Sequence, residues 1–181
     1  MRLLCKKSTL SKKYKILLIM VVALVTLDQT TKFYVNSQMV LYQSIDVIKN
    51  FFQITYIRNP GAAFGILSGI KSPLLNIFFL SISIAAIGIM LIYYHQTPGN
   101  KRLTLISFAL IISGATGNFI DRIYHGEVID FLYFHWYKHY WPAFNVADSC
   151  ITIGVILLLW EMFVTKTFFG TLYSPDLSKR K

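Results

Sequence analysis

The stretch GATGNFIDRIYHGEVIDFLYFHWYKHYWPAFNVAD occupies residues 114–148 and holds four of the eight acidic residues in this chain of 181. Asp130 stands inside an apolar run, and Asp148 precedes a long apolar segment. A carboxylate is costly to place in apolar surroundings unless it is paired, hydrogen-bonded or functional. We interpret the stretch as the end of one membrane span, a loop and the start of the next, with two acids that have a specific role.

The composition around this stretch is that of a membrane protein. Hydrophobic residues make up 55% of the chain and charged residues only 14%, and the apolar residues are clustered in long segments. The length suits a single domain, residues 1–181. The net charge of +10 does not indicate nucleic-acid binding, because the basic residues lie at the two ends and in one short loop rather than on a patch.

Four apolar segments predict four transmembrane helices, at about residues 14–35, 73–94, 103–121 and 145–164. The basic start followed by an apolar run resembles a signal peptide. That run lacks a small-x-small cleavage site and continues into polar residues, so we favour an uncleaved span. The fold class predicted is therefore an all-α membrane protein with four transmembrane helices.

The basic residues also predict the orientation. Twelve of the 18 lie in the first 15 residues, in the tail at 165–181 and in the loop between the second and third spans. Under the positive-inside rule this places both termini in the cytoplasm. The aromatic loop at residues 123–144 then lies at the outer interface, together with Asp28, Asp130 and Asp148.

The outer segment, residues 36–72, carries a short strand signal at residues 51–57, where β-branched and aromatic residues gather. Asn59, Pro60 and Gly61 follow and predict a turn, because proline fixes φ and glycine permits positive φ. The small residues after the turn allow a close approach of the backbone to another group.

Polar residues recur at helical spacing on two of the spans. Asp28 and Lys32 are spaced i,i+4, which fits either an interfacial ion pair or a role inside the bundle. Gly114, Asn118 and Arg122 follow one another at steps of four and share one small, polar face. Arg122 either pairs with the adjacent Asp121 or orients a substrate carbonyl or lipid phosphate.

Asn145 and Asp148 stand at the start of the fourth span with i,i+3 spacing. They fit a helix N-cap with an acid near the positive end of the helix dipole. That structural interpretation leaves Asp130 unexplained. Two carboxyls in a low-dielectric site do not both ionise easily, so one of them stays protonated. Such a pair can act jointly, because the ionised carboxyl can take a proton from water while the protonated one donates to a substrate carbonyl. We hypothesise that Asp148 is the ionised member.

No metal, cofactor or disulfide is predicted. His135 and His139 have i,i+4 spacing, but no third zinc ligand is evident in the sequence. Cys5 lies in the basic tail and Cys150 in an apolar segment, so we do not expect them to meet.

Five blocks of sequence resemble the signal peptidase II family, the lipoprotein signal peptidases of bacterial membranes, over about residues 20–160. The blocks are DQTTK at 28–32, NPGAAF at 59–64, GATGNFIDR at 114–122, VIDF at 128–131 and FNVAD at 144–148. The resemblance implies an aspartic endopeptidase that removes the signal peptide of prolipoproteins before the diacylglyceryl-modified cysteine.

The resemblance also assigns residues and surroundings. The catalytic pair falls on Asp130 and Asp148, and the supporting positions are Asp28, Lys32, Asn59, Gly61, Gly114, Asn118, Arg122 and Asn145. A small β-cradle is implied on the extracytoplasmic side, between the first two spans. The expected setting is the bacterial cell membrane, with lipid-modified prolipoproteins and membrane lipids as partners, no nucleic acid, and a monomeric enzyme.

Two other classes of protein remain open from the residues alone. A small proton-coupled transporter also uses intramembrane acids, but predicts them strung across the depth of the bilayer. A structural assembly factor uses polar residues only to bind helices together, and predicts that neutral isosteres of the acids are tolerated.

Overall fold

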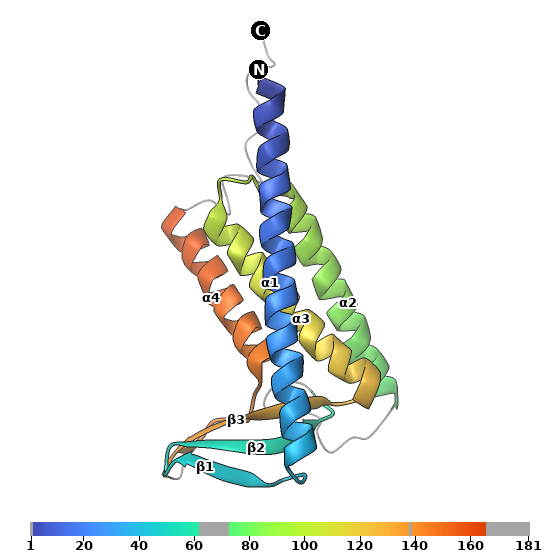
Figure 1. Cartoon of the computed structure of the whole chain (residues 1–181), viewed down its shortest axis with the longest axis vertical. Coiled ribbons are helices and arrows are strands. Elements are labelled where there is room, and N and C mark those ends of the chain that lie inside the picture. The colour runs from blue at the N-terminus through green and yellow to red at the C-terminus, as the bar shows by residue number, and fades with distance from the viewer. Residues whose placement is uncertain (1, 62–72, 138, 166–181) are drawn as a thin grey trace.

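The computed structural model describes residues 2–61, 73–137 and 139–165. Four helices form a bundle and a small sheet lies across one end of it (Figure 1). The elements in chain order are α1 (Arg2–Gln38), β1 (Ser44–Ile48), β2 (Phe52–Asn59), α2 (Pro73–Gln96), α3 (Arg102–His125), β3 (Val128–Trp136), β4 (His139–Tyr140) and α4 (Val146–Thr165). The start of α1 and the connection from α2 to α3 lie at the end away from the sheet (Figure 1).

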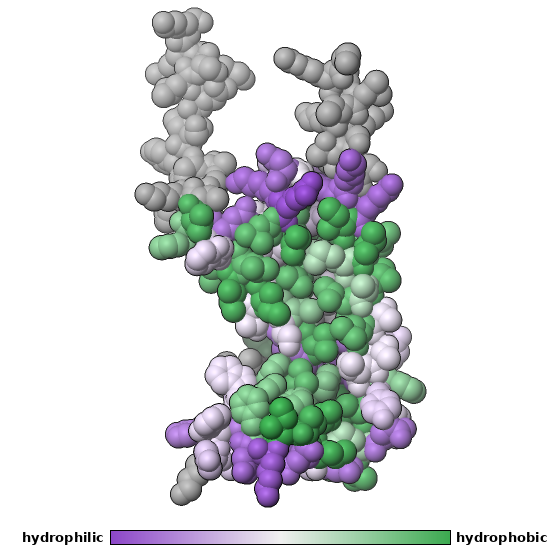
Figure 2. All heavy atoms as spheres, turned by 60° about the vertical axis from the view of Figure 1, so that its left-hand side comes forward, coloured by the Kyte–Doolittle hydropathy of each residue, from purple (hydrophilic) through white to green (hydrophobic). Residues whose placement is uncertain are grey.

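All four helices are long and apolar enough to cross a membrane. The candidate spans are Lys12–Gln38, Leu74–Gln96, Arg102–His125 and Val146–Val164, of 27, 23, 24 and 19 residues, and about 20 residues suffice to span the hydrocarbon core. On the face seen in Figure 2, a hydrophobic belt separates two hydrophilic ends. The chain is thus a multi-pass membrane protein, as the hydropathy pattern predicts.

Helix α3 is the central helix of the bundle and packs against the other three. Its buried residues run from Leu105 to Asp121. Small residues allow the close approach of α4. A Cβ atom added to Gly154 of α4 would lie 2.8 Å from both the Ser107 carbonyl oxygen and Ile111 Cγ1 of α3. Gly114 of α3 is similarly pressed against the Ala147 backbone, as in other membrane helix pairs that meet through small residues.

We expect Gly154→Ala to destabilise the bundle by about 1–3 kcal/mol, because the added methyl group overpacks a contact with backbone that cannot rotate away. Gly88→Ala is the matched control, since an added Cβ there has nothing within 4 Å. Unfolding of the purified proteins in one detergent measures both. Equal stability of the two variants would contradict this packing.

The sheet is antiparallel, with strand order β1-β2-β3-β4. Strands β2 and β3 pair from Phe52 with Phe134 to Asn59 with Val128, so the end of β2 lies beside the start of β3. Tyr56 and the first residues of β3 pack with Val35 at the end of α1. This apolar contact attaches the sheet to the bundle.

Two expectations from the sequence are corrected here. Residues 123–144 are not only a loop, because β3 occupies Val128–Trp136 within them. The β-containing region therefore is not confined to residues 36–72. Aromatic and β-branched residues suit a membrane interface and a strand equally well, and pairing with β2 decides between them.

Several predicted boundaries also shift. The span predicted at about residues 14–35 corresponds to the candidate span Lys12–Gln38. Helix α1 itself begins earlier, at Arg2, so the basic segment is also helical. The strand expected at residues 51–57 is β2, and β1 pairs with it. The predicted tail lies outside the described residues from position 166 onward.

At the end of the bundle away from the sheet, Lys13 caps helix α2. Its Nζ donates to the carbonyl oxygens of Tyr94, His95 and Thr97 at 3.0, 2.7 and 2.8 Å. The Tyr94 hydroxyl donates in return to the Lys13 carbonyl oxygen at 2.6 Å. Carbonyl groups at a helix C-terminus lack partners inside the helix, and a cation there also complements the helix dipole. This contact joins α1 to α2.

Candidate active site

Asp130 lies near the start of β3, where the sheet meets the bundle, and its side chain is 3% exposed. Its Oδ2 accepts a hydrogen bond from Asn59 Nδ2 at 3.0 Å. Its Oδ1 accepts one from Asn145 Nδ2 at 2.8 Å. The pairing of β2 with β3 brings Asn59 here, and the start of α4 brings Asn145. Both carboxyl oxygens therefore have a donor in a buried site.

Asp148 lies in the first turn of α4 and forms a capping box with Asn145. The Asp148 amide donates to Asn145 Oδ1 at 2.9 Å, and the Asn145 amide donates to Asp148 Oδ2 at 3.2 Å. This reciprocal pair satisfies two amides at the helix start, so the predicted cap is confirmed. The second carboxyl oxygen, Oδ1, accepts from Asn118 Nδ2 at 2.7 Å.

Asn145 links the two carboxyls directly. Its side chain is completely buried, with 0% exposure. The side-chain amide nitrogen donates to Asp130 Oδ1, and the backbone amide donates to Asp148 Oδ2. The side-chain oxygen accepts from the Asp148 backbone amide. One asparagine thus holds two acids that lie on different elements and are 18 positions apart in the sequence.

The pKa of Asp130 is raised to about 7 from its ordinary value of 3.8, first by burial and second by the nearby charge of Asp148. Hydrogen bonds from Asn59 and Asn145 oppose this rise. Burial disfavours the charged form of a carboxyl, and a neighbouring anion disfavours it again. Asp130 therefore retains its proton over much of the range below neutral pH.

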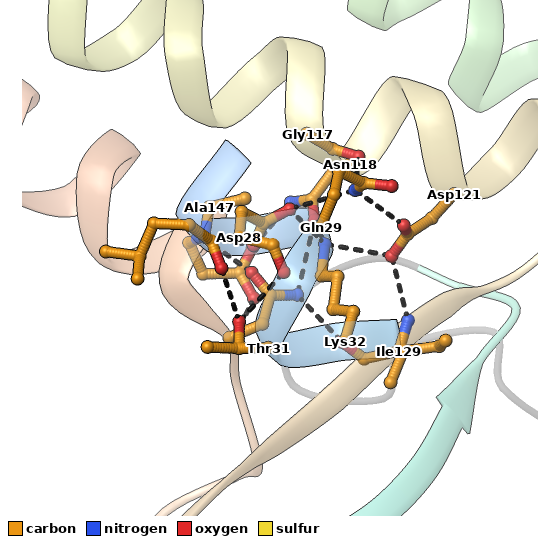
Figure 3. A network of polar contacts seen from close by, with 12 residues as sticks. Asp28, Gln29, Thr31, Lys32, Gly117, Asn118, Asp121, Ile129 and Ala147 are labelled. Carbon is orange, nitrogen blue, oxygen red and sulfur yellow. Dashed lines mark hydrogen bonds and ion pairs between the residues drawn. The ribbon is translucent and has the colours of Figure 1, made fainter. Parts of the chain in front are cut away.

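Lys32 lies in a buried network of polar groups together with Asp28, Asn118 and Asp121 (Figure 3). Its Nζ forms ion pairs with Asp28 Oδ2 at 2.9 Å and Asp121 Oδ2 at 2.8 Å. It also donates to Asn118 Oδ1 at 3.0 Å. Because that oxygen is bound to Lys32, the amide nitrogen of Asn118 is directed to Asp148.

Arg122 lies at the edge of this network, beside the segment that follows β2. Its Nη2 donates to the Gly61 carbonyl oxygen at 3.1 Å, and the Gly61 amide donates to Asn59 Oδ1 at 3.0 Å. The guanidinium carbon lies 5.0 Å from the centre of the Phe79 ring. Arg122 thereby orients the turn that carries Asn59. The adjacent Asp121 takes Lys32 as its ion-pair partner.

The structure brings together nearly every residue that the sequence singles out. Connected by the contacts above are Asp28, Lys32, Asn59, Gly61, Asn118, Arg122, Asp130, Asn145 and Asp148. Gly114 contributes through the close approach of α3 to α4 rather than through a polar group.

The sequence does not predict two features of this network. One is the participation of Gln29, and the other is the ion pair between Asp121 and Lys32. Gln29 Nε2 lies 2.9 Å from Asp121 Oδ1 and 3.1 Å from both Asp28 Oδ2 and the Gly117 carbonyl oxygen. The available signal was helical spacing, because Gly117 and Asp121 are four residues apart, beside the face of Asn118.

His135 and His139 do not lie in surroundings that resemble a zinc site. The His135 ring stacks against Tyr140 at 5.8 Å between ring centres, and His139 is exposed. In residues 2–61, 73–137 and 139–165, no group of three or more His, Cys, Asp or Glu is placed to hold a metal ion.

Comparisons with known proteins agree on one family. The family model for signal peptidase (SPase) II matches residues 20–164. A lipoprotein signal peptidase of Syntrophus aciditrophicus is 47% identical over 152 residues, which covers 83% of this chain and 94% of that protein. One from Geobacter metallireducens is 45% identical over 151 residues, with 82% and 91% covered.

A solved structure described as a bacterial membrane enzyme is similar in fold as well as in sequence. It superimposes with a TM-score of 0.73 at 33% identity, covering 90% of this chain and 94% of the other. The blocks of sequence that form the polar network, from Asp28 to Asp148, all lie inside the matched region.

Proposed function

This chain belongs to the signal peptidase II family, and from that premise we propose that it is an aspartic endopeptidase that removes the signal peptide from prolipoproteins. The cut falls before the diacylglyceryl-modified cysteine. Asp130 and Asp148 are its catalytic pair. The observation that carries the proposal is the single buried Asn145, whose side-chain amide donates to the Asp130 carboxyl and whose backbone amide donates to the Asp148 carboxyl.

The proposed reaction follows from the different surroundings of the two acids. Asp148, as the anion at the helix N-terminus, takes a proton from a water molecule. The water oxygen attacks the carbonyl carbon of the scissile peptide bond, while Asp130 donates its proton to the carbonyl oxygen. The tetrahedral intermediate then breaks its C–N bond. The leaving nitrogen takes the proton held by Asp148, and the hydroxyl proton returns to Asp130.

The asparagines act as holders of this pair. Asn59 and Asn145 bind the two oxygens of Asp130, and Asn118 binds Asp148. Positioning of this kind keeps acid and base within reach of the same peptide bond. All of these groups come from this chain, and the proposed chemistry requires no cofactor.

We further propose that the sheet end of the bundle is extracytoplasmic and that both termini are cytoplasmic, in a bacterial cell membrane. Basic residues at the start of α1 and between α2 and α3 lie at the opposite end, as the positive-inside rule requires. The signal helix of the substrate then lies among the spans, and its lipid remains in the outer leaflet. We expect the enzyme to act as a monomer.

Activity is expected to fall as pH rises through about 7, because Asp130, whose pKa is raised to about 7, must carry a proton to donate. Below that pH it is protonated and competent. Above it, both carboxyls are ionised and the acid is lost. The rate of single-turnover cleavage, measured from about pH 5 to 9 in one detergent, tests this, and a rate that still rises above about pH 8 would contradict it.

The function itself is tested with the purified full-length protein and a diacylglyceryl-modified prolipoprotein in detergent micelles. We expect release of the signal peptide and a new N-terminus at the modified cysteine, identified by mass spectrometry. A precursor whose cysteine is replaced by serine, and therefore carries no lipid, is the matched control and is expected to remain intact. Failure of the folded protein to cut the modified precursor would overturn the proposal.

A further inference from the structure

Two buried carboxylates outside the catalytic pair bind the backbone next to it. Asp28 Oδ1 accepts from the Ala147 amide at 2.8 Å, and Ala147 immediately precedes Asp148. Asp121 Oδ2 accepts from the Ile129 amide at 3.1 Å, and Ile129 immediately precedes Asp130. Each catalytic aspartate thus follows a residue whose amide is held by another acid.

Both of these acids are bound to the same cation. Lys32 Nζ lies 2.9 Å from Asp28 Oδ2 and 2.8 Å from Asp121 Oδ2, and Lys32, Asp28 and Asp121 are 1%, 1% and 2% exposed. Figure 3 shows the two contacts together with the amides of Ile129 and Ala147. A continuous path of polar contacts therefore runs from the backbone before Asp130, through one ammonium group, to the backbone before Asp148.

We propose that Asp121, with Lys32 and Asp28, forms a backbone clamp that sets the separation of Asp130 and Asp148, which makes Asp121 a positioning residue for the reaction. The proposal rests on the proposed aspartic function. None of the three clamp residues is placed to bind the peptide in this scheme. They act by fixing where β3 and α4 begin relative to one another.

The packing around the clamp leaves it little freedom. Gly117 of α3 lies so close that an added Cβ would be 2.5 Å from Asp28 Oδ2 and 3.1 Å from Ala147 Cβ. Gln29 adds a donor to Asp121 Oδ1 at 2.9 Å. A buried ion pair fixes geometry well because loss of one partner leaves an uncompensated buried charge.

The first test is Asp121→Asn in the full-length enzyme with the lipid-modified precursor. The new amide oxygen still accepts from Ile129, but one of the two charges that hold Lys32 is gone, and with it the ionic link between Lys32 and the start of β3. We expect kcat to fall by about 10–100-fold, with KM changed less than about twofold, because a small misplacement of catalytic groups costs rate rather than substrate affinity. The alkaline limb of the pH profile moves to lower pH, since a looser site weakens the repulsion between Asp130 and Asp148.

Asp46→Asn is the matched control for the loss of one acid at the same end of the molecule. Asp46 is exposed on β1, where it accepts from Gln53 Nε2 at 2.7 Å. We expect wild-type kcat, KM and pH profile for this variant.

Gly117→Ala tests the clamp without removing any polar group. It also provides an independent test of the clamp if Asp121→Asn does not fold. The added methyl group displaces Asp28, so kcat is expected to fall by about 10-fold with KM retained. Gly88→Ala, with nothing within 4 Å of the added Cβ, is its control and is expected to be fully active.

The outcomes separate this proposal from the one on which it rests. If Asp130→Asn and Asp148→Asn are inactive while Asp121→Asn and Gly117→Ala keep the wild-type kcat and pH profile, the clamp is wrong and the catalytic pair stands. A fall in kcat for Asp121→Asn with no shift of the pH profile also overturns the clamp, because separation of the two acids would then be unchanged. If Asp130→Asn and Asp148→Asn are both active, the aspartic mechanism itself fails.

Discussion

Asp130→Asn and Asp148→Asn, made singly, are each expected to lower kcat/KM for the lipid-modified precursor by about 10²–10⁴-fold, the usual contribution of a positioned general acid or base. Asparagine has nearly the same shape as aspartate, and its side-chain oxygen can still accept a hydrogen bond from Asn59, Asn118 or Asn145. What is lost is the ability to exchange a proton. Initial rates of precursor cleavage by the purified variants measure the effect.

The control for this experiment is Asp46→Asn, which removes an exposed acid at the sheet end of the molecule and is expected to be active. All variants must remain folded, which is checked by their thermal unfolding. Full activity in either catalytic variant would contradict the dyad. It would favour instead a structural role, in which polar groups only hold helices together and neutral replacements are tolerated.

Asn145 is expected to give the second largest effect, because it caps α4 and binds both catalytic acids. Asn145→Ala removes the cap, at a cost of about 0.5–2 kcal/mol, and leaves Asp130 Oδ1 without its donor, at a further cost of about 1–3 kcal/mol in a buried site. Activity falls as well, by about 10²-fold, since alanine has no side-chain amide to orient Asp130 toward the start of α4.

Asn145→Ser separates these two roles. Serine is also a good N-cap, but its hydroxyl group is too short to cap the helix and bind Asp130 together. We expect unfolding measurements to show that Asn145→Ser recovers most of the stability lost in Asn145→Ala, whereas cleavage assays show both variants to be similarly impaired. Recovery of activity along with stability would show that Asn145 acts only as a cap.

The membrane spans were predictable because each is a local property of the sequence. A continuous apolar segment of about 20 residues requires no knowledge of its neighbours. The cap formed by Asn145 and Asp148, and the ion pair of Asp28 with Lys32, were equally accessible, since both depend on fixed spacing within one helix.

Contacts between different helices and strands were harder to predict from the sequence. Asn59 reaches Asp130 only because β2 and β3 pair in one register, and β3 was expected to be part of a loop. The sequence offers the adjacent Arg122 as a partner for Asp121, but the packing of α1 against α3 gives Asp121 an ion pair with Lys32. Such pairings depend on which elements meet in space, and one sequence read by itself does not specify that.

The bond between Asp28 and the Ala147 amide also has a bearing on biosynthesis. Asp28 lies on α1, which leaves the ribosome before α4, where Ala147 lies. A nascent chain in the translocation channel therefore carries Asp28 and Lys32 long before Asp148 has been made. On the proposed mechanism, proteolytic competence therefore arises only when α4, which carries Asp148, inserts and meets α1.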